Sequence, residues 1–380
     1  MDPVKLLLGF LVLGSVGQLH MVNGHGGTRV CKFPAIYNFG DSNSDTGAIS
    51  AALSEVQPPN GESFFGSPSG RFCDGRLLVD FIAEKLKLPL LSPYLDSLGT
   101  NFRHGANFAT GGSSIRPGGY SPFHLGIQIS QFVRFKSHST ALYTQLTPNA
   151  TSSPFKSKLP RPKDFSKALY TIDIGQNDLG YGFQHTTPEK VVASIPDILG
   201  QLSEAIHKLY EERARFFWVH NTGPIGCLPY TVIYDKSKPG SLDGNGCVKP
   251  QNAVAQEFNR QLKDKLLQLK KTLPLAVFTY VNVYSAKYEL ISYAKDLGFV
   301  DPLEFCCGSY YGYHINCGKK AIVNGTVYGN PCKNPSKHIS WDGIHYSQAA
   351  NLWVADHILN GSFSEPPVSI GEACHSLKNV

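Results

Sequence analysis

Two short segments at opposite ends of the chain carry side chains that together suit nucleophilic catalysis. The first runs from Phe39 to Gly47 and includes Ser42, and the second runs from Trp341 to His345 and includes Asp342. A serine hydroxyl is a weak nucleophile until an imidazole takes its proton, and that imidazole needs a carboxylate to fix its tautomer. The three-residue spacing lets Asp342 meet one ring nitrogen of His345 and leaves the other nitrogen for Ser42.

Each segment alone has a simpler interpretation. Gly-Asp-Ser-Asn after an apolar run is typical of a turn before a helix, because these side chains accept hydrogen bonds from exposed amides. Asp342 and His345 also fit a helix start with a solvated histidine. The presence of both segments in one chain favours the catalytic interpretation.

Two further segments offer donors for the oxyanion that forms when a serine attacks an ester. Residues 105–113 contain the pair Gly111-Gly112, where a backbone amide can approach a ligand closely. Residues 168–178 are an apolar run that stops in polar residues, of which Asn177 carries a side-chain amide donor. Such residues are also ordinary turn formers, but open α/β sheets gather their chemistry at the carboxyl ends of their strands.

Short apolar runs alternate with helical patterns along the chain. Runs that end in polar or glycine residues are typical of buried parallel strands, and the sequence has five: Ala35 to Phe39, Asn101 to Ala109, Ala168 to Ile174, Phe216 to Asn221 and Ala276 to Asn282. Helical spacing of apolar residues begins at Leu77, spans Gln251 to Lys271 and returns from Ser347 to Leu359. This order predicts an α/β fold with a single doubly wound, flavodoxin-like sheet of about five parallel strands and helices on both faces.

Long insertions interrupt this pattern, and loops of this kind commonly shape a binding cleft. They run from Ala48 to Gly75, from Gly223 to Pro250 and from Glu304 to Pro335. Three tyrosines in or near the last of these either line an acyl or sugar site or simply pack: Tyr310, Tyr311 and Tyr313.

The first 24 residues have the features of a cleaved signal peptide. Lys5 precedes an apolar stretch from Leu6 to Leu19, and small residues follow before Gly24. A retained membrane anchor is the alternative, but the stretch is shorter than the roughly 20 apolar residues that a spanning helix needs. We therefore expect one exported hydrolase domain over residues 25–380, in the extracellular space or the cell wall.

Nine cysteines fit an oxidising compartment. A zinc site is the rival interpretation, but paired Cys-x-x-Cys spacing is absent, so disulfides are favoured and one thiol is left over or pairs between chains. Three sequons predict glycosylation at Asn149, Asn324 and Asn360.

Composition sets further limits on function. The chain is 42% hydrophobic, enough for a substantial core, and its formal net charge of +6 fits an ordinary solvated surface. No basic cluster with interleaved aromatic residues points to nucleic acid.

Four blocks of this sequence, taken in order, resemble those of the plant GDSL-type esterase/lipases of the SGNH hydrolase superfamily. The blocks are residues 39–47, 107–112, 175–178 and 342–345. The sequence is most similar to the branch that contains early-nodulin-like proteins, a latex esterase and acetylesterases of plant glycosides. The resemblance implies the SGNH-hydrolase fold and a triad of Ser42, Asp342 and His345. It also implies an oxyanion hole made by the amides of Ser42 and Gly111, with Gly112 as the alternative, and by the Asn177 side chain.

The function implied by these residues is hydrolysis of carboxylic esters of lipids, glycosides or wall polysaccharides through an acyl-enzyme on Ser42. No metal or organic cofactor is implied, and no partner other than a small or polymeric ester substrate. A secreted carbohydrate-binding or defence protein of weak activity is the alternative. Attack on phosphate or glycosidic bonds would require metal or arginine clusters, or two facing carboxylates, that the sequence does not display.

Overall fold

A computed structural model of the chain describes residues 30–146, 154–234, 240–310 and 314–375. The predicted signal peptide, Asn149, Tyr311 and Tyr313 lie outside these ranges. Within them, no helix is both long enough and apolar enough to cross a membrane.

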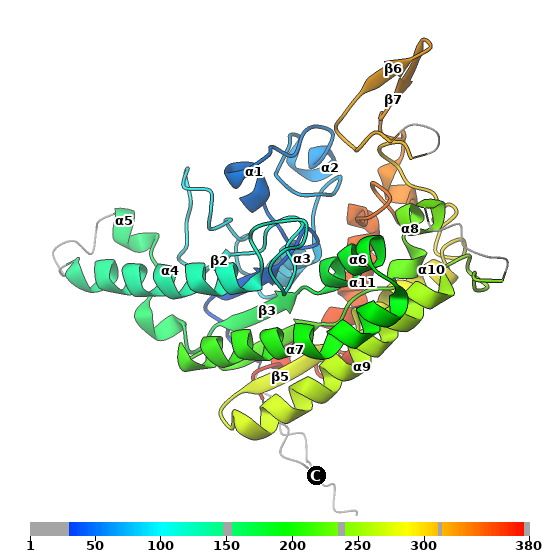
Figure 1. Cartoon of the computed structure of the whole chain (residues 1–380). Coiled ribbons are helices and arrows are strands. Elements are labelled where there is room, and N and C mark those ends of the chain that lie inside the picture. Colours follow the sequence, from blue (N-terminus) through cyan, green and yellow to red (C-terminus); the bar gives the residue numbers. More distant parts are fainter. Residues whose placement is uncertain (1–29, 147–153, 235–239, 311–313, 376–380) are drawn as a thin grey trace, which may run out of the picture.

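A six-stranded sheet forms the centre of the molecule (Figure 1). Its order is β2-β1-β3-β4-β5-β8, and all neighbours are parallel except the last pair. The strands are β1 (Ile36–Gly40), β2 (Gly105–Asn107), β3 (Leu169–Asp173), β4 (Phe216–His220), β5 (Val277–Val281) and β8 (Ser364–Glu365). The predicted doubly wound α/β sheet is thus confirmed, with one short antiparallel strand added at its edge.

The strand order reverses at β1, because β2 pairs on one side of β1 and β3 pairs on the other. Ile36 lies opposite Gly105 in one pairing and opposite Leu169 in the other. A crevice outside the carboxyl ends of the strands is expected at such a switch point. The predicted strand from Asn101 to Ala109 proves shorter, because its first residues form a turn in which the Gly105 amide donates to the Phe102 carbonyl.

Helices cover both faces of the sheet, as the sequence predicts (Figure 1). One face packs against α4 (Leu125–Gln145), α7 (Pro188–Glu211) and α9 (Lys249–Thr272). The other packs against α3 (Leu78–Lys85), α10 (Val283–Ser292) and α11 (Gln348–Leu359). Shorter elements lie in the connections: α1 (Ala48–Ala52), α2 (Glu62–Phe65), α5 (Pro154–Ser157), α6 (Gln176–His185), α8 (Pro229–Tyr234) and the hairpin of β6 (Ala321–Val323) and β7 (Thr326–Tyr328).

Side chains of the strands alternate between the two apolar layers. Tyr37 and Phe39 of β1 enter the α4/α7/α9 layer, whereas Ile36 enters the α3/α10/α11 layer. This alternation is the period of two that a pleated strand imposes. Because both faces of the sheet are buried, most positions of a strand carry an apolar residue, and the strands are almost continuous apolar runs in the sequence.

Eight of the nine cysteines form disulfides: Cys31–Cys374, Cys227–Cys247, Cys306–Cys332 and Cys307–Cys317. The remaining thiol, Cys73, is fully buried. The prediction of disulfides with one thiol left over is confirmed. Two sequon asparagines, Asn324 at the turn of the β6–β7 hairpin and Asn360 after α11, are exposed, and their glycosylation stays a prediction.

We predict that the Cys31→Ser/Cys374→Ser double variant unfolds at a lower temperature than the wild type. The disulfide closes a loop with a sequence separation of 343 residues, and its loss should cost about 2–4 kcal/mol by releasing chain entropy in the unfolded state. Thermal unfolding followed by circular dichroism measures the effect. The matched control is Cys227→Ser/Cys247→Ser, which opens a separation of only 20 residues; an equal or larger loss in the control would contradict the chain-entropy explanation.

Candidate active site

Ser42, His345 and Asp342 form a chain of short hydrogen bonds at the carboxyl edge of the sheet. The Ser42 Oγ lies 2.8 Å from His345 Nε2, and His345 Nδ1 lies 2.6 Å from Asp342 Oδ2. Because a carboxylate only accepts, Nδ1 carries the ring hydrogen and Nε2 is left to accept from the serine hydroxyl. This is the arrangement that activates a serine as a nucleophile.

The loop that carries Asp342 and His345 is fixed by its own hydrogen bonds and by Tyr310. The Asp342 Oδ1 accepts from the His345 amide at 2.7 Å, and the Tyr310 hydroxyl donates to the Asp342 carbonyl at 2.7 Å. Gly343 has φ +88°, and a Cβ there would lie 2.6 Å from the Tyr310 ring. Tyr310 is 6% exposed. Of the two interpretations of this tyrosine, packing is therefore the one that the structure supports.

Disulfides hold the segment around Tyr310 against the same loop. The Cys306 and Cys307 amides both donate to the Trp341 carbonyl, at 2.9 and 2.7 Å. Cys306 and Cys307 are each bonded to a second cysteine. The cysteine-rich insertion thus fixes the backbone next to Asp342 through these hydrogen bonds.

The turn that carries Ser42 follows directly from β1 and is anchored by Asp41. Asp41 Oδ1 accepts from the Asn43 amide at 2.9 Å, and its Oδ2 accepts from Gln176 Nε2 at 2.7 Å. Gln176 in turn accepts from the Thr222 hydroxyl at 3.3 Å. Gln176 therefore ties the ends of β1, β3 and β4 together, and sequence reasoning missed it although it stands beside Asn177.

The hydrogen bonds of Asp45 bear on which amide of the Gly111-Gly112 pair is free to donate to an oxyanion. Its Oδ2 accepts from the Gly111 amide at 2.7 Å, and its carboxylate also accepts from the Gly47 and Ala48 amides, at 2.8 and 2.6 Å. The Gly111 N–H is thus already used within the protein, which argues against its role as an oxyanion donor. Gly112, the alternative in the pair, has φ +75° and becomes the candidate.

Asn177 lies in the first turn of α6 and lines the same pocket as Ser42. Its Nδ2 donates to the Ser113 carbonyl at 2.8 Å, which fixes the orientation of the amide. Since a carboxamide nitrogen carries two N–H groups, one remains for a ligand. Ser113 follows the glycine pair, so this hydrogen bond also joins the two predicted donor segments.

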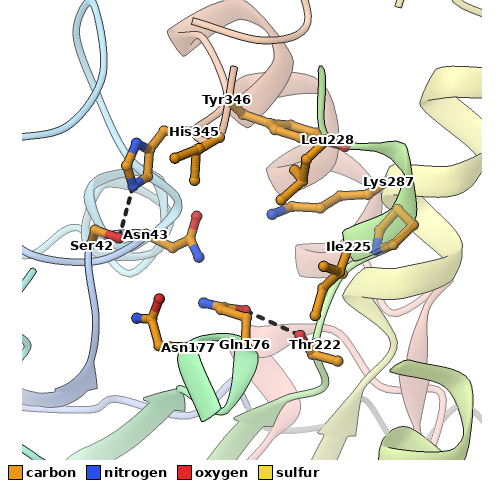
Figure 2. Close-up of a pocket in the computed structure, with 13 residues that line it drawn as sticks. Ser42, Asn43, Gln176, Asn177, Thr222, Ile225, Leu228, Lys287, His345 and Tyr346 are labelled. Atoms are coloured by element: carbon orange, nitrogen blue, oxygen red, sulfur yellow. Dashed lines mark hydrogen bonds between the residues drawn. The ribbon is translucent and has the colours of Figure 1, made fainter. Parts of the chain in front are cut away.

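A small cavity of about 60 Å³ opens beside the Ser42 hydroxyl, and Figure 2 shows the side chains around it. It is lined by Ser42, Asn43, Gln176, Asn177, Thr222, Gly223, Pro224, Ile225, Leu228, Lys287, Ile344, His345 and Tyr346. Among the described residues of the three long insertions expected to shape the cleft, those in this lining all belong to Gly223 to Pro250. Lys287 was missed, although a lysine on the buried stripe of α10, otherwise largely apolar, is a signal that the sequence offers.

Lys287, which lines this cavity, interacts electrostatically with the buried carboxylates of Asp41 and Asp173, and Asp173 also lies next to His220. Burial, followed by the neighbouring Asp173 carboxylate, raises the pKa of Asp41 to about 7. Burial also works to raise the pKa of Asp173, but the adjacent His220, 3.3 Å away, and Lys287 take it below its usual range. Burial lowers the pKa of Lys287, against the opposing effect of Asp173 and Asp41.

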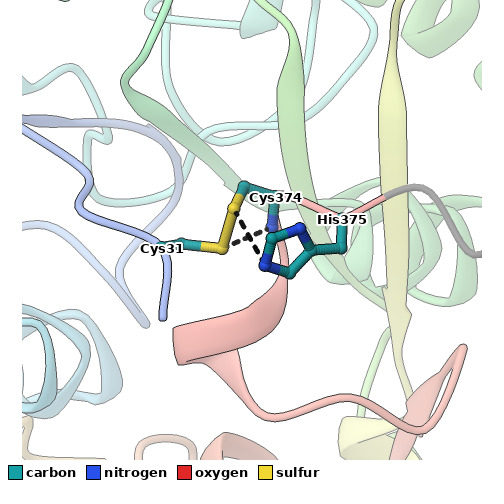
Figure 3. A group of neighbouring side chains, drawn as sticks. All are labelled: Cys31, Cys374 and His375. Atoms are coloured by element: carbon teal, nitrogen blue, oxygen red, sulfur yellow. Dashed lines mark hydrogen bonds between the residues drawn. A yellow bond between two sulfur atoms is a disulfide. The ribbon is translucent and has the colours of Figure 1, made fainter. Parts of the chain in front are cut away.

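Two groups combine cysteines with a histidine at distances that would suit a metal ion. One is Cys31, Cys374 and His375, shown in Figure 3, and the other contains Cys306, Cys332 and His338. In each group the two sulfurs are joined in a disulfide. Metals bind the thiolate form of cysteine, so neither group offers a sulfur ligand in this oxidised state.

The chain belongs to the GDSL-like lipase/acylhydrolase family, whose sequence pattern matches residues 36–358. It is 53% identical to a GDSL esterase/lipase of Arabidopsis thaliana over 99% of both chains. It is 50% identical to a protein named alpha-L-fucosidase 3 of Arabidopsis thaliana, over 87% of this chain and 91% of that one. An esterase of Hevea brasiliensis is 46% identical over 93% and 92%. The predicted family is confirmed, and the chain is an esterase of this class.

We predict that the stability difference between the wild type and Asp41→Asn depends on pH. An unfolded aspartate titrates near about 3.9, whereas the pKa of buried Asp41 is raised to about 7. The folded chain therefore binds the proton of the Asp41 carboxyl group more tightly than the unfolded chain does. The contribution of this proton to the stability of the fold is complete below pH 4 and is lost as the pH rises towards 7. Melting temperatures of both proteins are measured from pH 4 to 8. The melting temperature of the wild type minus that of Asp41→Asn should fall over this range. A difference that does not change with pH would contradict the raised pKa.

Proposed function

We propose that the chain hydrolyses carboxylic esters through a covalent acyl intermediate on Ser42. The observation that carries this proposal is the chain of hydrogen bonds of 2.8 and 2.6 Å from Ser42 through His345 to Asp342, beside a cavity. Membership of the esterase family supports the same chemistry.

We assign each atom a role in this mechanism. Ser42 Oγ attacks the ester carbonyl carbon while His345 Nε2 takes the hydroxyl proton. When the tetrahedral intermediate collapses, His345 returns that proton to the leaving alcohol, and the acyl group remains on Ser42. A water molecule then gives a proton to Nε2 and attacks the acyl carbon. When this second tetrahedral intermediate collapses, the bond between the acyl carbon and Ser42 Oγ breaks, His345 returns the proton to Ser42 Oγ, and the acid is released. Asp342 holds the ring in its working tautomer throughout.

We assign the oxyanion site to the backbone amides of Ser42 and Gly112 and to the Asn177 side chain. Gly112 replaces Gly111 in this proposal because the Gly111 amide donates to Asp45. The hydrogen bond from Asn177 to the Ser113 carbonyl, 2.8 Å long, supports a preset position for this donor. Donors that are fixed before the reaction stabilise the developing charge without reorganisation.

Glycosidic bonds are a second candidate target, since one relative is named a fucosidase. Glycosidases normally use two carboxylates that face the scissile bond. Asp41 and Asp173 are buried near the cavity, but the described residues that line it include no aspartate or glutamate. Comparison of an aryl acetate with an aryl α-fucoside decides between the two, and we expect turnover of the acetate.

We also propose that the protein acts outside the cell. The apolar segment near its start, the four disulfides and the exposed sequon asparagines support this location.

We predict that Ser42→Ala lowers kcat on a short-chain aryl ester by at least about 10³-fold, because the change removes the oxygen that carries the acyl group in the proposed mechanism. Thermal unfolding should be unchanged within a few degrees. Ser130→Ala, which removes an exposed hydroxyl on α4, is the matched control and should keep full activity. If the wild type binds acylated sugars without cleaving them, and Ser42→Ala binds them equally well, the protein is a binding module rather than an enzyme.

We predict that Asn177→Ala lowers kcat about a hundredfold or more with little change in KM, because its donor acts on the oxyanion of the transition state. Asn43→Ala removes another amide that lines the cavity and donates to Asp41 at 3.3 Å. Its effect on kcat should be less than about tenfold. Steady-state kinetics on one aryl ester measure both variants, and a larger loss in Asn43→Ala would remove Asn177 from the oxyanion site.

A further inference from the structure

Lys287 brings a buried ammonium group to the cavity beside Ser42. It lies in α10, is 9% exposed, and lines the cavity together with Ser42 and His345. Figure 2 shows its nitrogen end pointing into the cavity. The Nζ lies 4.4 Å from the centre of the Tyr346 ring, over its face. Lys287 is thus placed to meet whatever enters this space.

Among the residues that the structure describes, the ammonium of Lys287 has no hydrogen-bond acceptor within 3.5 Å and no carboxylate partner within 4.0 Å. Two lysines that are only half-buried differ: Lys136 Nζ donates to the Glu212 carboxylate at 2.7 Å, and Lys156 Nζ donates to the Leu146 carbonyl at 2.6 Å. An ammonium carries three N–H donors, and leaving them unsatisfied in a buried place is costly. The acceptors for Lys287 must therefore come from the contents of the cavity.

A purely structural role as a counter-ion explains only part of this arrangement. Asp173 and Asp41 act on Lys287 through space and favour its charged form, so they compensate its charge. Neither carboxylate is close enough to accept a hydrogen bond from it. Because the two carboxylates offset part of this charge, a ligand does not have to be an anion, but it does have to supply an oxygen or another acceptor.

The other walls near Lys287 would accept a hydrocarbon group. Ile225, Leu228 and Tyr346 line the same cavity. An alkyl chain that filled the space would displace water from the ammonium and leave its donors without partners, whereas a group with an acceptor oxygen would satisfy them. A site built around a hydrogen-bonding group discriminates strongly against an analogue that lacks the partner atom.

We propose that Lys287 is a specificity-determining residue that hydrogen-bonds an acceptor oxygen of the substrate next to its scissile ester. The enzyme then prefers esters of oxygen-rich compounds, in which a hydroxyl or ether oxygen stands close to the ester, over esters of the matching hydrocarbons. This inference rests on the proposed ester hydrolysis and names its substrate class. The oxygen belongs either to the acyl group or to the alcohol, and the two arms of the experiment separate these sources.

The acyl arm compares 4-nitrophenyl methoxyacetate with 4-nitrophenyl butyrate, in which a methylene replaces the ether oxygen. The alcohol arm compares methyl 6-O-acetyl-α-D-glucopyranoside with cyclohexylmethyl acetate, which lacks the ring oxygen and the hydroxyls. Each kcat/KM is divided by the rate constant of hydroxide-catalysed hydrolysis of the same ester, which removes differences in intrinsic reactivity. The wild type should prefer the oxygenated ester in at least one arm by about tenfold or more.

Lys287→Met keeps an unbranched side chain only one atom shorter but removes its donors, and it should bring the ratio of the two kcat/KM values in that arm to about one. Lys263→Met makes the same change at an exposed lysine that pairs with Glu365 and should keep the wild-type preference. Equal losses on both esters of a pair in Lys287→Met would identify a counter-ion role alone and overturn the proposal. If Lys287→Met does not fold, the wild-type ratios decide, and a preference for the hydrocarbon ester in both arms overturns the proposal.

Failure of the proposed function has a different signature. In that case the wild type cleaves none of the four esters, and this inference falls with it. Cleavage of all four without any oxygen-dependent preference leaves the ester hydrolase intact and overturns the role of Lys287 alone.

Discussion

The hydrogen bond between Ser42 and His345 sets the strictest geometric demand on this molecule. It joins side chains 303 residues apart at 2.8 Å, so the end of β1 and the loop before α11 must both be fixed within a fraction of an ångström. The parallel sheet fixes the end of β1, since β1 lies between β2 and β3. The disulfide-bonded insertion fixes the loop before α11. Its backbone amides donate to the Trp341 carbonyl, and its Tyr310 hydroxyl donates to the Asp342 carbonyl.

Many of the polar residues around the site hold the surrounding loops and strand ends in place, and Gln176 does so while it also lines the cavity. Asp45 collects backbone amides from both the nucleophile segment and the glycine pair. Asn107 donates to the Ser44 carbonyl at 2.6 Å and to the Thr46 hydroxyl at 2.9 Å. Gln176 bridges the ends of three strands. Since buried polar groups cost free energy unless they are satisfied, these networks specify one arrangement of the loops.

The sequence predicted the features that depend on local pattern. Buried parallel strands are short apolar runs, and β1, β3, β4 and β5 were located within a residue or two of their ends. β8 has two residues and carries no periodicity at all. The choice between Gly111 and Gly112 depends on where Asp45 points, which is tertiary information. Lys287 was missed for the same reason, because only the packing of α10 against the strand ends brings a lone lysine to the cavity. The disulfide partners likewise follow from the folded path of the chain.

The bond between Cys31 and Cys374 turns almost the whole described chain into a covalent ring. A protease that nicks a single exposed loop inside this ring produces two pieces that stay tethered to each other. The halves of the site, Ser42 near one end and His345 near the other, would then remain on one molecule at a high effective concentration. Such a topology suits a protein that has to survive among hydrolytic enzymes.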